Sequence, residues 1–171
     1  MKYHILTDET KIHNGVTLYR IQALQNFSNV MAGDKGGWIE KESNLSQYGN
    51  AWIYDTAMVY GNAEIYGNAE IYDNARIYGY AEVYGYAEVY GNSEVFGTAM
   101  VYGNAKVYDN ARIYGNAEIY DNARIYGYEK VSGSAEVYDN AIVAESECKK
   151  WNQFPAQMLS SRVFGIGQSD E

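Results

Sequence analysis

The chain of 171 residues is poor in the residue types on which most catalytic sites and secreted scaffolds depend. It has one cysteine, Cys148, which excludes an internal disulfide framework and fits a reducing compartment. It has two histidines, His4 and His13, and both precede the repetitive middle of the chain. Neither a histidine base nor a three-histidine zinc site can be assembled in that middle part, so we expect no catalytic residue, metal or cofactor there.

Long apolar runs are missing from the N-terminus. The first residues, Met1 to Leu6, contain neither the apolar core of a secretory signal nor a membrane span. We therefore expect a cytoplasmic protein that does not enter a membrane.

Positive charge is also scarce. The chain has 13 basic and 22 acidic residues, and residues 48–143 hold 5 and 13 of them. Such a surface repels the phosphate backbone of nucleic acids unless its basic groups cluster. The composition therefore disfavours nucleic acid as a partner and favours a basic or neutral protein.

A six-residue repeat fills the middle of the chain. Residues 48–143 form sixteen hexads, from Tyr48-Gly49-Asn50-Ala51-Trp52-Ile53 to Tyr138-Asp139-Asn140-Ala141-Ile142-Val143. In an extended chain, Ala and the Ile or Val two positions later share one side, and Glu or Arg and the next Tyr share the other. Gly or Asp followed by Asn adopts positive φ most easily and is expected to form a corner. This spacing produces no stripe at the helical period and predicts a β-solenoid.

The hexads resemble the hexapeptide repeat of left-handed parallel β-helices. In that repeat an aliphatic residue recurs every six positions with a small residue four positions after it, as in Ile65 to Ala69 and Ile71 to Ala75. The resemblance covers over half of the chain. It implies an all-β fold, a single-stranded left-handed parallel β-helix with three hexads in each triangular coil and about five coils in all.

The pattern divides the chain into three segments. Residues 1–47 break the rhythm, and Asn14-Gly15 between two alternating segments predicts a β-hairpin that caps the first coil. Residues 48–143 form the β-helix. Residues 144–171 leave the repeat, and the apolar Trp151 and Phe154 beside Pro155 predict a partly helical tail that caps the last coil or docks on another subunit.

The glycine-rich segment 32–40 precedes the repeat. It lacks the GK[ST] signature and a following helix, so we expect a tight turn that places Trp38 over the coil instead of a phosphate-binding loop. Together with Asn44-Leu45-Ser46, this segment resembles the opening segment of the YdcK-like β-solenoids, an uncharacterised hexapeptide-repeat family of bacteria and phages. That resemblance brings no known activity with it.

With three hexads per coil, every eighteenth residue stacks, and the outward side chains form columns. One column is acidic and is a candidate site for a cationic partner or a calcium ion, although acidic columns also keep solenoids soluble. Two others are mixed. The three columns are Glu64, Glu82, Met100, Glu118 and Glu136; Met58, Arg76, Glu94, Arg112 and Lys130; and Trp52, Glu70, Glu88, Lys106, Arg124 and Ile142.

Tyrosines form further outward ladders, in which stacked rings stabilise neighbouring coils. A rigid tyrosine wall is also a good binding surface, because tyrosine offers a large contact area at low entropic cost. Tyr80, Tyr86 and Tyr128 at corner positions enlarge this surface. The candidate interaction surface consists of Tyr66, Tyr84, Tyr102, Tyr80, Tyr86, Glu64, Glu82, Glu118 and Glu136.

Two local features lead to further expectations. Asp73, Asp109 and Asp121 each precede an arginine by three residues, which predicts ion pairs within a hexad. Glu129 occupies a position that alanine fills elsewhere. Because a buried unpaired carboxylate is costly, a local bulge or a hydrogen-bonded carboxylate is expected at Glu129.

The sequence thus favours a non-catalytic interaction protein whose partner is another protein or further copies of itself, as a dimer or trimer. One version of this hypothesis, taken from the resemblance to phage proteins, is an inhibitor of a host factor. The alternatives are a hexapeptide-type acyltransferase, disfavoured because the repeat has no histidine, and a polymer-forming scaffold.

Overall fold

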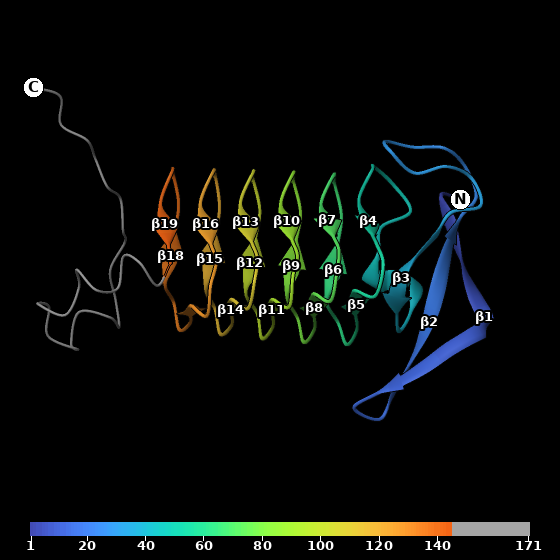
Figure 1. Ribbon diagram of the computed structural model, residues 1–171, viewed down its shortest axis with the longest axis horizontal. Coiled ribbons are helices and arrows are strands. Elements are labelled where there is room, and N and C mark those ends of the chain that lie inside the picture. The colour runs from blue at the N-terminus through green and yellow to red at the C-terminus, as the bar shows by residue number, and fades with distance from the viewer. Residues whose placement is uncertain (145–171) are drawn as a thin grey trace, which may run out of the picture.

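A computed structural model gives the fold of residues 1–144 (Figure 1). The predicted tail, residues 145–171, lies outside the described residues. Within residues 1–144 the fold is all-β apart from one short 3-10 helix, η1 (Glu42–Asn44). Three longer strands come first: β1 (Tyr3–His13), β2 (Val16–Ala23) and β3 (Lys35–Ile39).

Each hexad contributes one strand of two residues. These strands are β4 (Trp52–Ile53), β5 (Met58–Val59), β6 (Glu64–Ile65), β7 (Glu70–Ile71), β8 (Arg76–Ile77), β9 (Glu82–Val83), β10 (Glu88–Val89), β11 (Glu94–Val95), β12 (Met100–Val101), β13 (Lys106–Val107), β14 (Arg112–Ile113), β15 (Glu118–Ile119), β16 (Arg124–Ile125), β17 (Lys130–Val131), β18 (Glu136–Val137) and β19 (Ile142–Val143). Every third strand pairs in parallel, as Glu88 does with Lys106, so one coil contains three hexads. The predicted β-solenoid is confirmed.

The coils stack into a rod with three faces. The hairpin face contains the sheet β1-β2-β3-β5-β8-β11-β14-β17, the acidic face contains β6-β9-β12-β15-β18, and the third face contains β4-β7-β10-β13-β16-β19. Strands β5, β6 and β7 form coil two, and each later group of three forms the next coil up to coil six, which contains β17, β18 and β19.

Coil one is formed largely outside the repeat. Strand β3 pairs in parallel with β5, and Leu45 forms a parallel bridge with Ile65. Residues 35–47 therefore supply two sides of a first coil that β4 completes. The rod has six coils instead of the five expected from the hexads alone.

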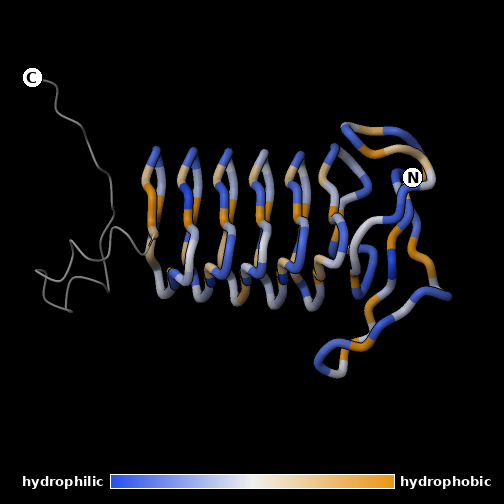
Figure 2. The backbone as a smooth tube through the Cα atoms, viewed as in Figure 1, coloured by the Kyte–Doolittle hydropathy of each residue, from blue (hydrophilic) through white to orange (hydrophobic). Residues whose placement is uncertain are grey.

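The core is a double column of small and branched side chains. The inward Ala, Ile and Val residues from Ala51 to Ile125 are fully buried, and Figure 2 shows hydrophobic residues recurring at the same place in successive coils. Burying each branched side chain contributes about 1.5–3 kcal/mol. Ser93, in an alanine position, is also buried and donates a hydrogen bond to the carbonyl of Tyr90 at 2.8 Å.

The corners follow the predicted turn chemistry. The first corner residue has positive φ whether it is glycine or aspartate, for example 69° at Gly91 and 58° at Asp73. The asparagine that follows stacks on its equivalent in the next coil, as in the hydrogen bond from Asn50 Nδ2 to Asn68 Oδ1 at 2.9 Å. These side-chain ladders add to the backbone hydrogen bonds that join the coils.

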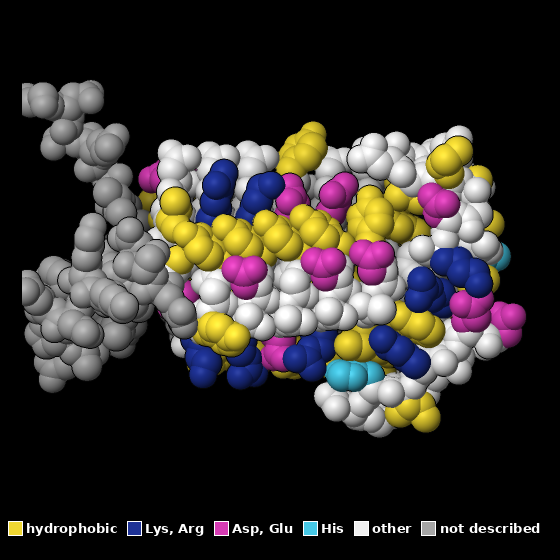
Figure 3. Space-filling model, viewed as in Figure 1, with side chains coloured by type: hydrophobic (Ala, Val, Ile, Leu, Met, Phe, Trp, Pro, Cys, Tyr) yellow, Lys and Arg dark blue, Asp and Glu magenta, His cyan; other side chains and the backbone are white. Residues whose placement is uncertain are grey.

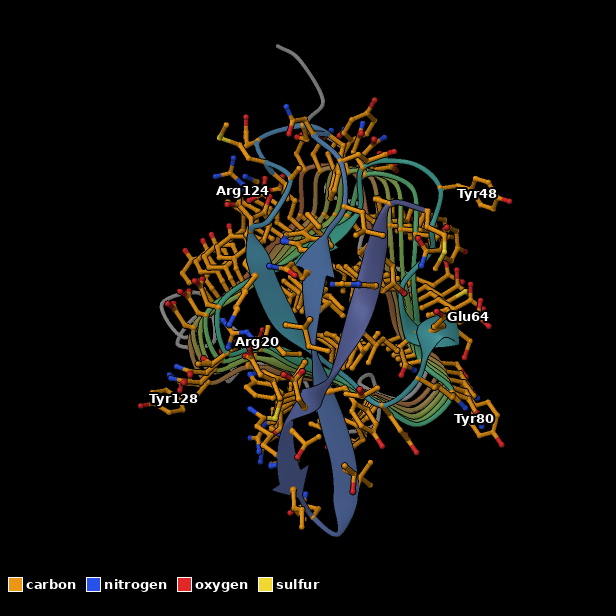
Figure 4. All side chains as sticks on the ribbon, turned by 90° about the vertical axis from the view of Figure 1, so that its right-hand side faces the viewer. Arg20, Tyr48, Glu64, Tyr80, Arg124 and Tyr128 are labelled. Atoms are coloured by element: carbon orange, nitrogen blue, oxygen red, sulfur yellow. The ribbon has the colours of Figure 1, made fainter. Side chains whose placement is uncertain are left out.

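The N-terminal hairpin closes one end of the rod. Its turn residues Asn14 and Gly15 have φ of 49° and 80°, and β1 and β2 pair antiparallel as predicted. Strand β2 pairs antiparallel with β3, so the hairpin extends the hairpin face, and its tip projects from the rod (Figures 1 and 4).

Buried polar contacts fasten the cap to coil one. The Tyr3 hydroxyl donates to the carbonyls of Leu45 at 2.7 Å and Glu42 at 3.1 Å. Buried Lys2 donates from Nζ to the carbonyl of Ala51 at 2.8 Å, while the Gln47 side chain bonds both backbone groups of Tyr3.

Two tryptophans do not lie where the sequence predicts. Trp52, expected on an outward column, is buried because the cap covers it, with Tyr3 and Phe27 packed edge-on at 6.1 and 5.3 Å between ring centroids. The turn expected in segment 32–40 forms at its start, where Gly33 has φ of 96° and the amide of Asp34 donates to the carbonyl of Met31 at 3.0 Å, but Trp38 follows it within β3. Lys11 and Arg20 lie over its ring at 4.8 and 5.2 Å.

Of the two alternatives expected at Glu129, a bulge or a hydrogen-bonded carboxylate, the bulge does not form. Strands β14 and β17 keep the regular register, and the amide of Arg112 donates to the carbonyl of Glu129 at 2.8 Å. Glu129 is half-buried in coil six, where the core is more open than in the middle of the rod. The position at the end of the rod lets a carboxylate replace alanine without distorting the coil.

We predict that Tyr3→Phe loosens the cap. The change leaves the buried carbonyl of Leu45 without its hydroxyl donor and should lower the free energy of unfolding of the cap by about 1–2 kcal/mol. Hydrogen exchange of the β1 amides measures this. The control is Tyr19→Phe, because Tyr19 is half-buried in β2 and no side-chain hydrogen bond of its hydroxyl is found within residues 1–144. Equal exchange rates in both variants would contradict the proposed role of Tyr3.

Candidate interaction surface

The acidic face presents a row of carboxylates. Its five strands carry Glu64, Glu82, Met100, Glu118 and Glu136 outward in coils two to six, in direct parallel register. None of these five strands carries a basic residue. Neighbouring side chains of the row are about 4.8 Å apart, so the face holds an uncompensated negative charge.

A tyrosine ladder runs beside this row. Rings of Tyr66, Tyr84, Tyr102, Tyr120 and Tyr138 follow one another along the rod, and the measured centroid separations are 4.8 Å for the first pair, 4.9 Å for the second, 5.0 Å for the third and 5.3 Å for the last. The rings are nearly parallel, which confirms the predicted stacking.

The tyrosines hold the carboxylates in place. The hydroxyl of Tyr66 donates to Glu82 at 2.7 Å, and those of Tyr102 and Tyr120 donate to Glu118 and Glu136 at 3.2 Å. Tyr84 has no such partner because the equivalent position is Met100. These bonds join residues sixteen apart, a spacing that the sequence analysis missed although it follows from the eighteen-residue coil.

These contacts favour the neutral phenol. Burial, followed by the hydrogen bond and charge of Glu82, raises the pKa of Tyr66. Burial and the charge of Glu118 raise the pKa of Tyr102 in the same way. On the third face, burial and Glu70 raise the pKa of Tyr54 to about 12.

Two exposed tyrosines flank the acidic face in coil three. Tyr80 occupies the corner between the hairpin face and the acidic face, and Tyr86 occupies the corner between the acidic face and the third face. Their side chains are 65% and 66% exposed. Figure 4 shows Glu64 pointing outward between the corners of Tyr48 and Tyr80, with Tyr128 at another corner. The structure thus brings all nine predicted residues onto one face and its corners, and their binding role stays a prediction.

The other two faces are mixed, as predicted. On the hairpin face, Glu94 forms ion pairs with Arg76 in the preceding coil and with Arg112 in the following coil, the latter at 3.0 Å. On the third face, Lys106 pairs with Glu88 at 2.8 Å. Figure 3 shows a line of hydrophobic side chains along the rod with charged side chains on both sides of it.

The ion pairs predicted within hexads are not formed in residues 1–144. The carboxylate of Asp73 accepts a hydrogen bond from the amide of Gly91 at 3.1 Å, and that of Asp109 accepts one from Gly127 at 3.3 Å. The corner backbone directs these carboxylates along the rod toward the next coil. Arg76 and Arg112 pair along the rod as well, both with Glu94, so these charges stabilise contacts between coils.

The two histidines lie in the cap. His4 Nε2 is 3.1 Å from Gln22 Oε1, and the His13 ring packs edge-on against Tyr60 with 5.7 Å between centroids. Burial, with Arg76 and Lys11, lowers the pKa of His13. Among the residues of the cap and rod described here, no group of three His, Cys, Asp or Glu is placed to hold a metal, which includes the calcium site considered for the acidic column.

The coil geometry decides the structural class. Three hexads per coil, partners eighteen residues apart and buried columns of Ala with Ile or Val recur from coil two to coil six. The chain is a hexapeptide-repeat β-helix protein. No helix of this β-helix protein within residues 1–144 is long and apolar enough to cross a membrane.

Sequence comparison adds one relative to this β-helix protein. No protein-family profile matches the chain. A stretch of 46 residues is 48% identical to the Uncharacterized acetyltransferase YdcK of Escherichia coli (strain K12). The match covers 27% of this chain and 14% of that protein.

We predict that alkaline pH destabilises the rod. The ladder tyrosines have raised pKa values when folded, so their contribution is complete below about pH 10, the ordinary pKa of tyrosine, and is lost as pH rises through the folded values. Urea unfolding should therefore show a falling free energy of unfolding above about pH 10. Absorbance at the tyrosinate band of the native protein should rise at a higher pH than that of the urea-unfolded chain. Coincident titration curves would contradict this.

Proposed function

We propose that this protein is a non-catalytic interaction module that presents its acidic face to a protein partner rich in lysine or arginine. The observation that carries the proposal is the hydrogen bonding of Glu82, Glu118 and Glu136 to ladder tyrosines. These bonds fix the carboxylates in coils three, five and six before any partner arrives. A surface that is already ordered loses less side-chain entropy on binding.

The surroundings of the carboxylates also support a binding face. The face has no basic strand residue, so a cationic partner meets no competing intramolecular ion pair there. Tyr80 and Tyr86 add exposed aromatic area at the two borders of the face. Tyrosine suits such borders because its ring is apolar and its hydroxyl stays hydrated.

Acyl transfer is the second candidate, because the matched protein is named an acetyltransferase. Acyl transfer needs a base within hydrogen-bond reach of the acceptor, and histidine is the usual base. Here His4 is bonded to Gln22 and His13 packs on Tyr60, both in the cap. Steady release of coenzyme A from acetyl-CoA by the purified protein, lost in His13→Ala, would favour the enzyme over the binding module.

The sequence also led to narrower hypotheses about the partner, the oligomeric state and the cellular location. An inhibitor of a host factor would use the same acidic face against a basic protein surface. A cytoplasmic location, and a dimer or trimer, stay predictions. A polymer-forming scaffold requires contacts between copies.

We predict that reversing charge on the acidic face abolishes partner binding. The immobilised wild-type protein should recover basic proteins from a bacterial lysate, and the Glu82→Lys and Glu118→Lys double variant should lose them because like charges repel. The matched control is the Glu70→Lys and Glu88→Lys double variant, which changes net charge equally on the third face. Quantitative mass spectrometry measures recovery. Retention by the acidic-face variant would remove this face from the account.

We further predict that the corner tyrosines contribute contact area. The Tyr80→Ser and Tyr86→Ser double variant should weaken binding of the recovered partner by roughly tenfold, since loss of an aromatic contact costs about 0.5–1.5 kcal/mol. Tyr128→Ser is the control, because Tyr128 is 68% exposed at a corner away from the acidic face. Titration calorimetry gives the affinities. A larger loss in the control would place the partner on another corner.

A further inference from the structure

The charge columns of two faces share one irregular coil. The hairpin face carries the uncharged Met58 in coil two and Arg76, Glu94, Arg112 and Lys130 in coils three to six, so its single acid lies in coil four. The acidic face carries glutamate in coils two, three, five and six and Met100 in coil four. The exception on each face therefore falls at the same height of the rod.

Contacts within the chain do not require methionine at position 100. Its neighbours in the sheet are Glu82 and Glu118, while Glu64 next to Glu82 and Glu118 next to Glu136 show that adjacent glutamates are accommodated. A glutamate at position 100 would also give the Tyr84 hydroxyl the acceptor that Tyr66 and Tyr102 have. The position of the exception points to a contact outside the chain.

We propose that the acidic face of one copy packs on the hairpin face of a second copy that runs in the opposite direction, with the two rods centred on coil four. This inference rests on the proposed function, because it names a partner for the same face. In this arrangement Met100 covers Glu94, and the three basic residues of the hairpin face each meet a glutamate: Arg76 with Glu118, Arg112 with Glu82, and Lys130 with Glu64.

The two faces have the same rise, so these contacts form together. Successive rings are 5.1, 4.9 and 5.0 Å apart on the hairpin face and 4.8, 4.9 and 5.0 Å apart on the acidic face. Glu94 is already paired with Arg76 and Arg112, and its side chain is only 13% exposed. A methionine can therefore cover it without leaving a charge unpaired, whereas a glutamate would add repulsion.

The hairpin sets the direction of the second rod. Its tip projects below the hairpin face at the N-terminal end, where His13 contacts Tyr60 (Figures 1 and 4). A parallel second rod would bring its own coil one and cap against this tip. An antiparallel second rod contacts coils three to six of the hairpin face of the first rod. The hairpin tip of the first rod then lies beyond coil six of the second rod.

The contact is small. Four coils span about 19 Å along the rod, and a face of roughly 15 Å gives roughly 300 Å² on each copy, well below a stable dimer interface. Association should therefore be weak and weaken further as salt rises. Because the acidic face of one copy binds the hairpin face of another, each copy can bind two neighbours. The size of the assembly should therefore keep increasing with protein concentration.

Sedimentation velocity with two charge-reversed variants tests the contact. The first variant carries Glu82→Lys and Glu118→Lys, and the second carries Arg76→Glu and Arg112→Glu. At several hundred micromolar and low salt, the wild type should associate, each variant alone should sediment as a monomer, and an equimolar mixture should regain association, because reversed faces meet each other. A monomeric wild type, an associating single variant or a monomeric mixture of folded variants would overturn the proposal.

A milder change keeps the test decisive if a reversed variant fails to fold. Met100→Glu should abolish association, because it places a carboxylate against Glu94, while Met100→Leu should retain it. Association of Met100→Glu at the wild-type level would overturn the proposal. Met100→Glu should still recover the basic partner proteins, since it adds a carboxylate to the acidic face. Loss of self-association with retained partner recovery thus separates this inference from the proposed function. The proposed function fails if the wild type recovers no basic protein or if recovery survives reversal of Glu82 and Glu118.

Discussion

Backbone hydrogen bonds between coils place every outward side chain beside the residue eighteen positions away, as the amide of Glu88 bonding to the carbonyl of Ala105 illustrates. No surface position can be chosen independently of its neighbours above and below. Rings must stack, amides must form ladders, and like charges must lie about one strand spacing apart. The inward columns meet this constraint with Ala and with Ile or Val, which pack at the axis without polar atoms.

The hairpin face and the acidic face differ in how they accommodate charges that stack in adjacent coils. The hairpin face places Glu94 between Arg76 and Arg112, so this acid pairs with both arginines and separates their like charges. The acidic face has no counter-ions in its strands, and three of its four carboxylates instead accept hydrogen bonds from tyrosines of the preceding coil. A hydrogen bond from a neutral hydroxyl holds a carboxylate without removing its charge. The acidic face therefore keeps both its order and its attraction for cations, and this combination makes it the best candidate for the functional surface.

Much of this arrangement could be predicted from the sequence because the repeat leaves little conformational freedom. The hexad fixes the coil, the inward columns, the corners and the membership of each outward column. The sequence could not show that the cap buries Trp52, because that depends on Tyr3 and Phe27, which lie far away along the chain. An ion pair between Asp73 and Arg76 was predicted from their proximity in the sequence. In the structure, the corner backbone turns the Asp73 carboxylate toward the amide of Gly91. The sequence could not show that the rod begins at β3, because Lys35–Ile39 forms one side of coil one without matching the hexad pattern.

The central claim is that the ordered carboxylates of the acidic face are the surface that makes contact. Carboxyl footprinting with mass spectrometry tests this most directly, by comparing labelling of Glu82 and Glu118 with that of Glu70 and Glu88 in the free and bound protein. The account predicts that binding protects Glu82 and Glu118 and leaves the third-face pair unchanged. Protection of Glu70 and Glu88 with unchanged labelling of Glu82 and Glu118 would contradict it.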